Sequence, residues 1–340
     1  MKPIAITLGD PAGIGPEIIA KAFRDAPQVL GGCLVAGDLA TVRRAVQAVT
    51  GPGQVAVPVA LIESPAQLPA VAPRCIPLLQ VGAPGDPVPW GQVSAAAGRL
   101  AADCVTWAAR AALRGEVAAL VTAPLHKEAL AAAGVPYPGH TELLQAEAAA
   151  FLARPLADLP VRMMLANEEL RTVLVSIHVS LREAIEAVTQ PAVLQTLRIT
   201  GESVGRMLGR RPRIAVAGLN PHAGEGGLFG REELDTIMPA MAAARAEGLD
   251  VSGPFAPDTV FMRARRGEFD VVVAMYHDQG LIPVKYLGVE QGVNVTLGLP
   301  LVRTSPDHGT AFDIAGSGQA DASSLVAAVR TARRLVAATS

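Results

Sequence analysis

"IAITLGDPAGIGPEIIAKAFRDA", residues 4–26, runs from an apolar segment through a glycine-rich turn into a helical pattern. Residues 4–10 are mostly apolar, which is typical of a strand buried on both faces. Residues 15–26 repeat apolar side chains at steps of three and four, which predicts an amphipathic helix. A buried strand that leads directly into a helix is the repeating unit of parallel sheets. The stretch therefore predicts an α/β protein.

The same alternation continues along the 340 residues. Further strands are expected at residues 32–38, 117–124, 161–167, 171–177, 213–219, 269–275 and 292–298. Helices are expected at about 39–49, 91–115 and 321–338. The two strands at 161–177 read as an antiparallel pair, so the middle sheet is expected to be mixed. The Pro-rich stretch 51–90 carries turn signals and predicts loops.

Composition excludes several classes of protein. The 29 basic and 31 acidic residues nearly balance, and no long basic run supports nucleic-acid binding. No apolar run approaches the roughly 20 residues of a membrane span, and the N-terminus lacks a signal segment. Cys33, Cys75 and Cys104 lie far apart in apolar surroundings, so we expect core thiols in a reducing cytoplasm. The length suits two domains.

Three of the six histidines directly follow expected strands: His178, His222 and His277. Ligands collect at the carboxyl ends of parallel strands, and three neutral imidazoles there suit a divalent metal with positions left open for substrate. Glu225 and Asp278 are placed to orient these ligands. The alternative is three separate loop histidines with ordinary hydrogen bonds.

The turn "GDPAGIGPE", residues 9–17, does not carry the glycine spacing of the dinucleotide fingerprint or of the Walker loop. Two interpretations remain open for it: an anion site at the helix N-terminus, or a tight strand-to-helix turn.

A second group of residues suits a small anionic ligand. His140 and Thr141 stand at an expected helix start, which Thr141 is placed to cap. Lys285, Asn294 and Arg303 add two charges and a directional amide. Together these side chains predict an anion pocket.

Motifs along nearly the whole chain carry a family resemblance. "DHGTAFDIAGSGQAD", residues 307–321, resembles the cofactor loop of isopropylmalate and isocitrate dehydrogenases, which bind NAD without the usual fingerprint. With "TLGDPAGIGPE", "TAPLHKEAL", "GHTELL", "GLNPHAGEGG" and "MYHDQGLIPVKY", the chain is similar to the 4-hydroxythreonine-4-phosphate dehydrogenase family.

The resemblance implies two α/β/α domains with a cleft between them, as in isocitrate and isopropylmalate dehydrogenases. Residues 1–125 with 281–340 would form the cofactor-side domain, and residues 126–280 the metal, substrate and dimerisation domain. It also implies a homodimer with a shared active site, NAD or NADP, and one divalent metal per subunit, which is Zn, Co or Mg. Both partners would contribute histidines to that metal.

The resemblance also implies roles for single residues. The metal ligands are His178, His222 and His277, the residues that the strand ends select. The substrate ligands are His140, Thr141, Lys285, Asn294 and Arg303. The cofactor ligands are His308, Gly309, Thr310, Ala311 and Asp313. The general base is open among Asp258, Asp278 and Lys285, and Asp258 is favoured.

The implied reaction oxidises 4-phosphohydroxy-L-threonine at C3 to a β-keto acid, which decarboxylates to 3-amino-2-oxopropyl phosphate in pyridoxal 5'-phosphate biosynthesis. One alternative is a dehydrogenase of D-threonate or D-erythronate 4-phosphate. An alternative of another class is a zinc hydrolase, which leaves residues 307–321 without a role. Unphosphorylated dihydrodiols fit the anion pocket poorly, and a non-catalytic binding protein leaves both the histidines and the loop unexplained.

Overall fold

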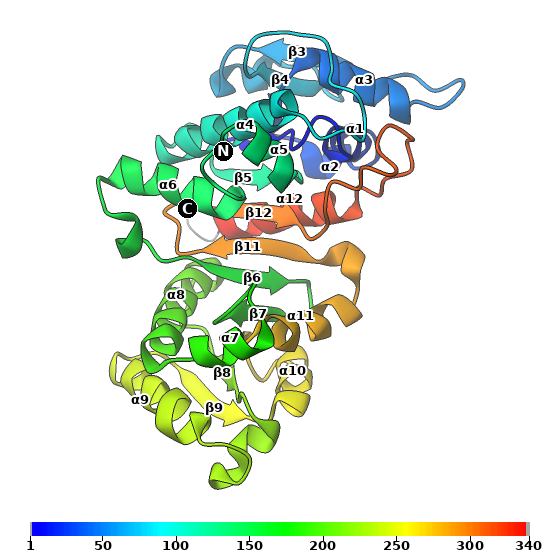
Figure 1. The fold of residues 1–340 in the computed structure, drawn as a ribbon. Helices are drawn as coiled ribbons and strands as arrows, with labels where there is room; N and C mark the ends of the chain where they lie inside the picture. Colours follow the sequence, from blue (N-terminus) through cyan, green and yellow to red (C-terminus); the bar gives the residue numbers. More distant parts are fainter. Residues whose placement is uncertain (1, 338–340) are drawn as a thin grey trace. The chain divides into compact units, whose positions relative to one another are not determined.

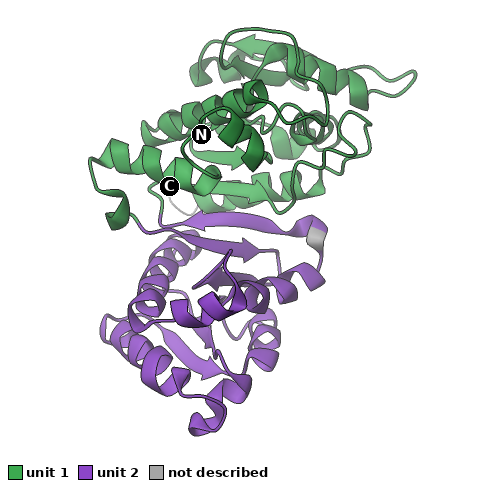
Figure 2. Cartoon of the chain, viewed as in Figure 1, with its two compact units in different colours: residues 1–159, 299–336 green, residues 160–298, 337–340 purple. Residues whose placement is uncertain are grey.

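Two units divide the chain in the computed structural model, which describes residues 2–337 apart from the Val289 side chain. Unit 1 holds the chain up to residue 159 together with residues 299–336, and unit 2 is built on residues 160–298 (Figure 2). Residues 126–159 belong to unit 1 because their helices pack on a long helix of that unit. Residues 281–298 belong to unit 2 because their strand pairs within its sheet. The boundaries of the two units thus lie after residues 159 and 298, whereas the sequence-based division places them after residues 125 and 280.

Unit 1 contains a parallel sheet, in which β1 lies between β2 and β5. In spatial order its strands are β3 (Val59–Ile62), β4 (Ile76–Gln80), β2 (Cys33–Gly37), β1 (Ile4–Thr7), β5 (Ala119–Thr122) and β12 (Arg303–Pro306). The strands β1, β2 and β5 are buried throughout, which explains their unbroken apolar sequences.

Helices follow the strands of unit 1, as the alternating pattern predicts. They are α1 (Gly15–Asp25), α2 (Pro27–Leu30), α3 (Leu39–Val49), η1 (Pro65–Ala70), α4 (Ala95–Leu113), α5 (Lys127–Ala132), α6 (His140–Leu152), η2 (Leu156–Asp158) and α12 (Ser323–Ala337). The side chains of Asp38 and Ser94 accept from backbone N–H groups and cap α3 and α4.

Two segments of unit 1 depart from the sequence-based expectation. The stretch 51–90 is not only loops, because it contributes β3 and β4 to one side of the sheet. These strands are short and β4 includes Pro77, so turn signals mask them. The strand β12 was not expected either, because its sequence Arg-Thr-Ser-Pro is polar. Its residues are nevertheless buried, and Thr304 donates its hydroxyl to the Ala328 carbonyl at 2.9 Å.

Unit 2 contains a mixed sheet. In spatial order its strands are β11 (Val293–Leu297), β6 (Arg162–Ala166), β7 (Arg171–Leu174), β10 (Val271–Ala274), β8 (Ile214–Ala217) and β9 (Val251–Phe255). The strands β6 and β7 form the predicted antiparallel pair, and β11 is antiparallel to β6. The strands β7, β10, β8 and β9 are parallel, so their carboxyl ends share one edge.

The helices of unit 2 surround this sheet (Figure 1). They are α7 (Leu181–Ala187), α8 (Gln190–Leu208), η3 (Pro221–Gly227), the π-helix η4 (Glu233–Ile237), α9 (Met238–Ala246), α10 (Pro257–Arg265), α11 (His277–Tyr286) and η5 (Val289–Gln291). A buried core of leucine, alanine and valine side chains joins β7, β8 and β10 to α10 and α11. Within residues 2–337, no helix is both long and apolar enough to cross a membrane. The predicted α/β class is confirmed.

Candidate active site

Two of the predicted metal ligands lie side by side in unit 2. His178 follows β7 and His277 follows β10, and these strands pair in parallel. The centroids of the two imidazole rings are 5.6 Å apart. Both rings line a hollow of about 260 Å³, which Ile177, Val179 and Tyr276 complete. Neighbouring parallel strands therefore bring the two imidazoles together, as the sequence predicts.

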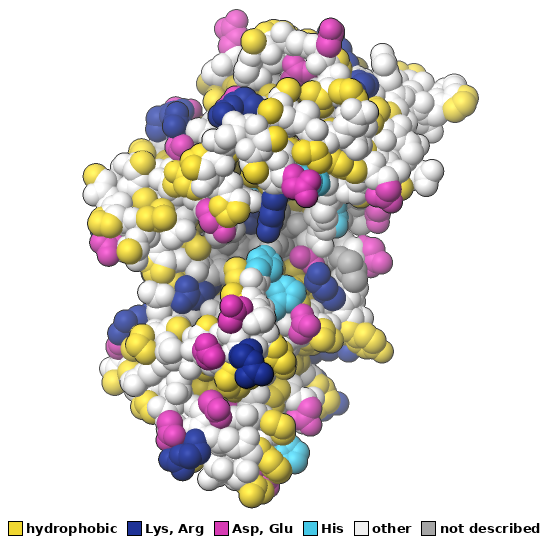
Figure 3. Space-filling view, viewed as in Figure 1, with side chains coloured by type: hydrophobic (Ala, Val, Ile, Leu, Met, Phe, Trp, Pro, Cys, Tyr) yellow, Lys and Arg dark blue, Asp and Glu magenta, His cyan; other side chains and the backbone are white. Residues whose placement is uncertain are grey.

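The third histidine, His222, follows β8 but faces elsewhere. Its ring stands edge-on to Phe229, with 5.8 Å between centroids, and 63% of its side chain is exposed. Histidine side chains reach the molecular surface in Figure 3, with acidic side chains nearby. Among the described residues of one chain, no three His, Cys, Asp or Glu side chains are placed to hold a metal. A single chain thus assembles two members of the predicted trio.

Carboxylates engage two of these imidazoles on the same ring nitrogen. Glu225 Oε2 lies 2.8 Å from His222 Nδ1, and Asp278 Oδ1 lies 2.7 Å from His277 Nδ1. The predicted orienting contacts are therefore present. Each leaves Nε2 available to a metal, so the donor set fits a borderline divalent ion. Glu225 raises the pKa of His222, and the charge of Asp258, in the first turn of α10, adds to this effect.

The loop that carries His222 has an unusual backbone. The φ angles are 52° at His222, 53° at Ala223, 78° at Gly224, 42° at Glu225 and 69° at Gly226. Three of these residues are not glycine, and such residues adopt left-handed φ only where the surroundings enforce it. The glycines of "NPHAGEGG" therefore serve a tight left-handed loop that presents an imidazole.

Two buried side chains that sequence reasoning missed hold the histidine loops of β8 and β10. Glu233 accepts from the backbone N–H groups of Leu219 and Asn220. Gln279 donates to the Gly218 carbonyl at 2.7 Å and accepts from the Met275 N–H at 2.7 Å. In the sequence, "REELDTI" reads as a solvated helix face and Gln279 as a neighbour of His277. No pattern distinguishes them before the fold is known.

The predicted anion ligands divide between the two units. Unit 1 places Arg303 and His140 close enough that the Arg303 charge acts on the His140 ring. Arg303 is 4% exposed, and its Nε and Nη2 donate to Thr122 Oγ1 at 3.1 and 2.8 Å. Burial lowers the pKa of Arg303 to about 10. Burial and the Arg303 charge hold the pKa of His140 well below its ordinary 6.5, so its imidazole is neutral.

The remaining members of that group occupy other elements. Thr141 lies in the first turn of α6, but Gly139 is the N-cap and no side chain caps this end. The prediction that Thr141 caps the helix is therefore wrong, because the helix begins at His140, two residues before the expected Glu142. Lys285 lies in the last turn of α11, and Asn294 lies on β11, both in unit 2.

The predicted cofactor loop packs against the turn of residues 9–17. The Ile14 N–H donates to the Thr310 carbonyl at 3.0 Å, and the Gly316 N–H donates to Glu17 Oε2 at 2.9 Å. A Cβ on Gly13 would lie 2.9 Å from the Thr310 carbonyl oxygen, so only glycine permits this approach. Two motifs that the sequence separates by nearly 300 residues thus form one structure.

Four backbone amides in the turn of residues 9–17 already have acceptors within the protein. The Asp10 N–H donates to the Pro124 carbonyl, the Ala12 N–H to Asp10 Oδ1, and the Gly13 N–H to the Asp10 carbonyl. Since the Ile14 N–H is also engaged, these four amides hold the tight turn itself, and both interpretations of the helix start stay predictions.

Buried polar atoms without partners gather in unit 1 after three neighbouring parallel strands. Among the described residues, Asp10 Oδ2, His126 Nδ1, His140 Nε2 and His308 Nε2 are enclosed and have no hydrogen-bond partner. These residues follow β1, β5 and β12. Phe312 stacks on His126 with 4.7 Å between ring centroids. Buried polar groups normally have partners, so this edge fits a polar ligand such as a nicotinamide cofactor.

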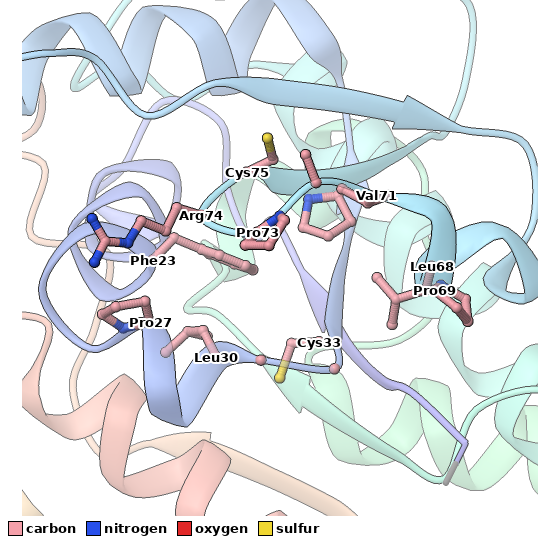
Figure 4. Close-up of a pocket in the computed structure, with 14 residues that line it drawn as sticks. Phe23, Pro27, Leu30, Cys33, Leu68, Pro69, Val71, Pro73, Arg74 and Cys75 are labelled. Atoms are coloured by element: carbon pink, nitrogen blue, oxygen red, sulfur yellow. The ribbon is translucent and has the colours of Figure 1, made fainter.

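A separate hollow of about 300 Å³ in unit 1 has an apolar lining that includes Phe23, Leu30 and Val71 (Figure 4). Cys33 and Cys75 also line it. Burial raises the pKa of the Cys33 thiol to about 11, as expected of a core cysteine. Cys75 is half-buried, so its prediction as a core thiol is wrong. No predicted site residue lines this hollow.

Comparison with known proteins identifies the family. Residues 30–332 match the family model of "Pyridoxal phosphate biosynthetic protein PdxA". The chain belongs to the PdxA family. It is 52% identical to a 4-hydroxythreonine-4-phosphate dehydrogenase of Beijerinckia indica, over 98% of this chain and 95% of that protein. It is 46% identical to a D-threonate 4-phosphate dehydrogenase of Salmonella typhimurium, over 98% and 99% of the two chains.

A crystal structure of the same family has the same fold. It is a 4-hydroxythreonine-4-phosphate dehydrogenase from Klebsiella pneumoniae, with a TM-score of 0.87 and 43% identity over 99% of this chain and all of that one. Relatives of this similarity over the full length make the chain an oxidoreductase. Membership of this family gives the zinc hydrolase alternative no support.

Proposed function

We propose that the chain oxidises 4-phosphohydroxy-L-threonine at C3 with NAD or NADP. The product is a β-keto acid that loses carbon dioxide to give 3-amino-2-oxopropyl phosphate, a step of pyridoxal 5'-phosphate biosynthesis in the cytoplasm. The observation that carries the proposal is the oriented histidine set of unit 2. His222 and His277 each engage a carboxylate through Nδ1, and His178 lies beside His277.

His178, His222 and His277 would hold one divalent metal per subunit, which is Zn, Co or Mg. When bound, such a metal supplies Lewis-acid polarisation of the substrate oxygen. The carboxylates of Glu225 and Asp278 orient the imidazoles that would bind it.

A second copy of this chain would complete the histidine trio in a homodimer with a shared active site. Exposed apolar side chains flank both parts of the trio, which supports this proposal. Val179 and Leu181, beside His178, are 50% and 60% exposed. Leu228, in the loop after His222, is 73% exposed. Apolar surface next to an incomplete ligand set favours association of like chains.

Substrate recognition would fall to His140, Thr141, Lys285, Asn294 and Arg303. Arg303 retains its charge at neutral pH even though burial lowers its pKa to about 10, so it suits the phosphate or carboxylate of the substrate. Neutral His140 can donate or accept a single hydrogen bond beside it.

Asp258 is the proposed general base, with Asp278 and Lys285 as alternatives. Asp258 is exposed at the start of α10 and acts electrostatically on His222, so it belongs to the same surroundings. It would take the proton of the C3 hydroxyl while hydride passes from C3 to the nicotinamide. Asp278 already engages His277, which favours an orienting role for it.

The cofactor would bind in unit 1, at His308, Gly309, Thr310, Ala311 and Asp313. The partnerless Nε2 of His308 and the glycine-dependent contact of Thr310 with the 9–17 turn support this assignment. Unit 1 would then be the cofactor side, and unit 2 the metal and dimerisation side.

A second candidate reaction is oxidation of D-threonate 4-phosphate, or of its relative D-erythronate 4-phosphate. The 46% identity to a D-threonate 4-phosphate dehydrogenase favours this candidate specifically. An amine and a hydroxyl both suit a metal-centred site, so the described side chains serve either substrate.

The proposal is tested by measuring the reduction of NAD and of NADP through the change in absorbance, with each of the three substrates. Each assay is run before and after a chelator removes the metal. We expect turnover with 4-phosphohydroxy-L-threonine that chelation abolishes and Zn²⁺ or Co²⁺ restores. Turnover only with an aldonate phosphate would select the second candidate. The metal site would be overturned if chelation left the turnover of the wild-type protein unchanged. It would also be overturned if the His178→Ala variant turned over as fast as the wild type.

A further inference from the structure

Glu233 is a buried carboxylate whose hydrogen bonds all point to the histidine loop after β8. It is 2% exposed and is the first residue of the π-helix η4. Its Oε1 accepts from the Leu219 N–H at 2.7 Å and from the Asn220 N–H at 2.8 Å. Its Oε2 accepts from Asn220 Nδ2 at 2.9 Å. A carboxylate is costly to bury without such donors, so the loop and Glu233 stabilise each other.

Glycines allow the loop to close around this carboxylate. A Cβ on Gly224 would lie 2.6 Å from Glu233 Oε2, and one on Gly218 would lie 3.1 Å from Oε1. By contrast, a Cβ on Gly226 would meet no atom within 4 Å. Residues 218–224, which include His222, therefore wrap directly onto the Glu233 carboxylate.

Two buried side chains hold this loop: Gln279 binds the carbonyl of Gly218 at its start, and Glu233 binds the N–H groups of Leu219 and Asn220, next to His222. His222 and Ala223 have left-handed φ angles, which persist only where surrounding structure enforces them. The His222 ring is 63% exposed, and it contacts Glu225 and Phe229, in the same loop region. The position of the ring therefore follows the backbone, to which Glu233 binds directly before His222.

We propose that Glu233 is a positioning residue for metal binding. Its carboxylate binds residues 219–220 and lies against Gly224, and so holds the left-handed turn that begins at His222 and presents His222 Nε2. This inference rests on the proposed function, in which His222 is a metal ligand. Glu233 itself does not contact the metal; it acts through the loop, in the way that outer-shell partners tune metal affinity.

Cobalt binding to the full-length protein tests the inference, with Glu233→Gln compared to Glu232→Gln. Glutamine keeps one oxygen that can accept from the backbone N–H groups. Its NH₂ group replaces the second oxygen and faces Asn220 Nδ2, which is also a donor, so that hydrogen bond is lost. Glu232 also accepts from Asn220 Nδ2, at 2.6 Å, but the contacts of the loop backbone N–H groups are with Glu233. We expect Glu233→Gln to weaken Co²⁺ affinity about 10- to 100-fold and Glu232→Gln to leave it near wild type.

Two further readouts separate positioning from general loss of stability. In hydrogen exchange, Glu233→Gln should accelerate residues 218–228 and leave β8 and α9 protected. If Glu233→Gln fails to fold, Gly224→Ala and Gly226→Ala replace it. Both glycines have positive φ, but only a Cβ at residue 224 would strike Glu233. Gly224→Ala should therefore weaken Co²⁺ affinity at least about tenfold more than Gly226→Ala.

The outcomes distinguish this inference from the function on which it rests. Wild-type affinity in Glu233→Gln, or equal affinities in Gly224→Ala and Gly226→Ala, would overturn the role of Glu233 and leave the metal site standing. If His222→Ala binds Co²⁺ as tightly as the wild type, the metal site and the inference both fail.

Discussion

In unit 1 several polar atoms at the carboxyl edge of the sheet are buried and lack partners, whereas in unit 2 His178 and His222 are exposed, His277 is half-buried, and two of the three engage carboxylates. His126 Nδ1 and Asp10 Oδ2 represent the first arrangement, and the His222–Glu225 pair represents the second. Burial without partners requires a ligand that supplies hydrogen bonds. Exposure with orienting partners suits the proposed metal site, which a second copy of the chain would complete. The difference teaches that the two sites would be completed in different ways, unit 1 by a polar ligand and unit 2 by the proposed metal and partner chain.

The largest effect that would sharpen this contrast is expected from Asp258→Asn in unit 2. Loss of a general base should lower kcat about 10²- to 10⁴-fold, while Co²⁺ affinity stays at the wild-type value. Steady-state rates and cobalt titration measure the two quantities on the same preparation. An unchanged kcat at the pH optimum would remove Asp258 from the reaction.

The next effect is expected from Arg303→Met in unit 1. The change removes a buried charge that neutral His140 cannot replace, so kcat/KM should fall about 10²- to 10³-fold. Substrate-saturation kinetics measure it, with Arg110→Met as the control because Arg110 is exposed and paired with Glu147. If kcat/KM falls equally in both variants, the buried Arg303 has no specific role in substrate binding.

A smaller effect is expected when an orienting carboxylate of unit 2 is removed. Asp278→Asn should weaken Co²⁺ affinity about 10- to 100-fold, because the His277 Nδ1 contact loses its charge. Asp235→Asn is the control, since Asp235 pairs with Arg231 on the surface. Equal affinities in the two variants would show that the carboxylate contacts of unit 2 do not prepare a metal site.

The smallest effect concerns the pH dependence of stability in unit 1. The pKa of His140 is well below 6.5 in the folded chain, so below about pH 6.5 only the unfolded chain takes up this proton. The stability that depends on neutral His140 is therefore fully present above about pH 6.5, and it is lost as the pH falls toward the pKa of His140 in the folded chain. His140→Gln should reduce the acid-side fall in Tm by about a few degrees, measured by calorimetry at several pH values. Parallel curves for the two proteins would contradict the buried neutral imidazole.

The sequence predicts what depends on strand order and fails where tertiary contacts decide. His178 and His277 could be paired because each follows an apolar strand, and such strands align in parallel. Arg303 could be assigned to an anion pocket, but its strand β12 could not be predicted, because burial of a polar sequence depends on partners such as Thr122. The predicted loops at 51–90 hide the strands β3 and β4 for another reason, because these strands are short and lie among turn signals that include Pro77.

The third histidine marks the limit of such predictions at the site. The strand before His222 was predicted, and β8 does pair with β10. The direction of the ring depends on five consecutive left-handed residues and on Glu233, which lies eleven residues after His222 in the sequence. No periodicity encodes a loop of this kind, and the adjacent Glu232 and Glu233 look alike until their burial is known.

The order of the chain has a consequence for its synthesis. Unit 1 takes β12 and α12 from residues 299–336, and β12 pairs with β5. When the ribosome has synthesised the first 159 residues, this strand and helix are still missing. One side of β5, a strand of apolar residues, is then uncovered. Residues 160–298 of unit 2 are continuous and are synthesised before this segment. The later unit along the chain can therefore fold first, whereas the earlier one is completed only when its last segment has been made.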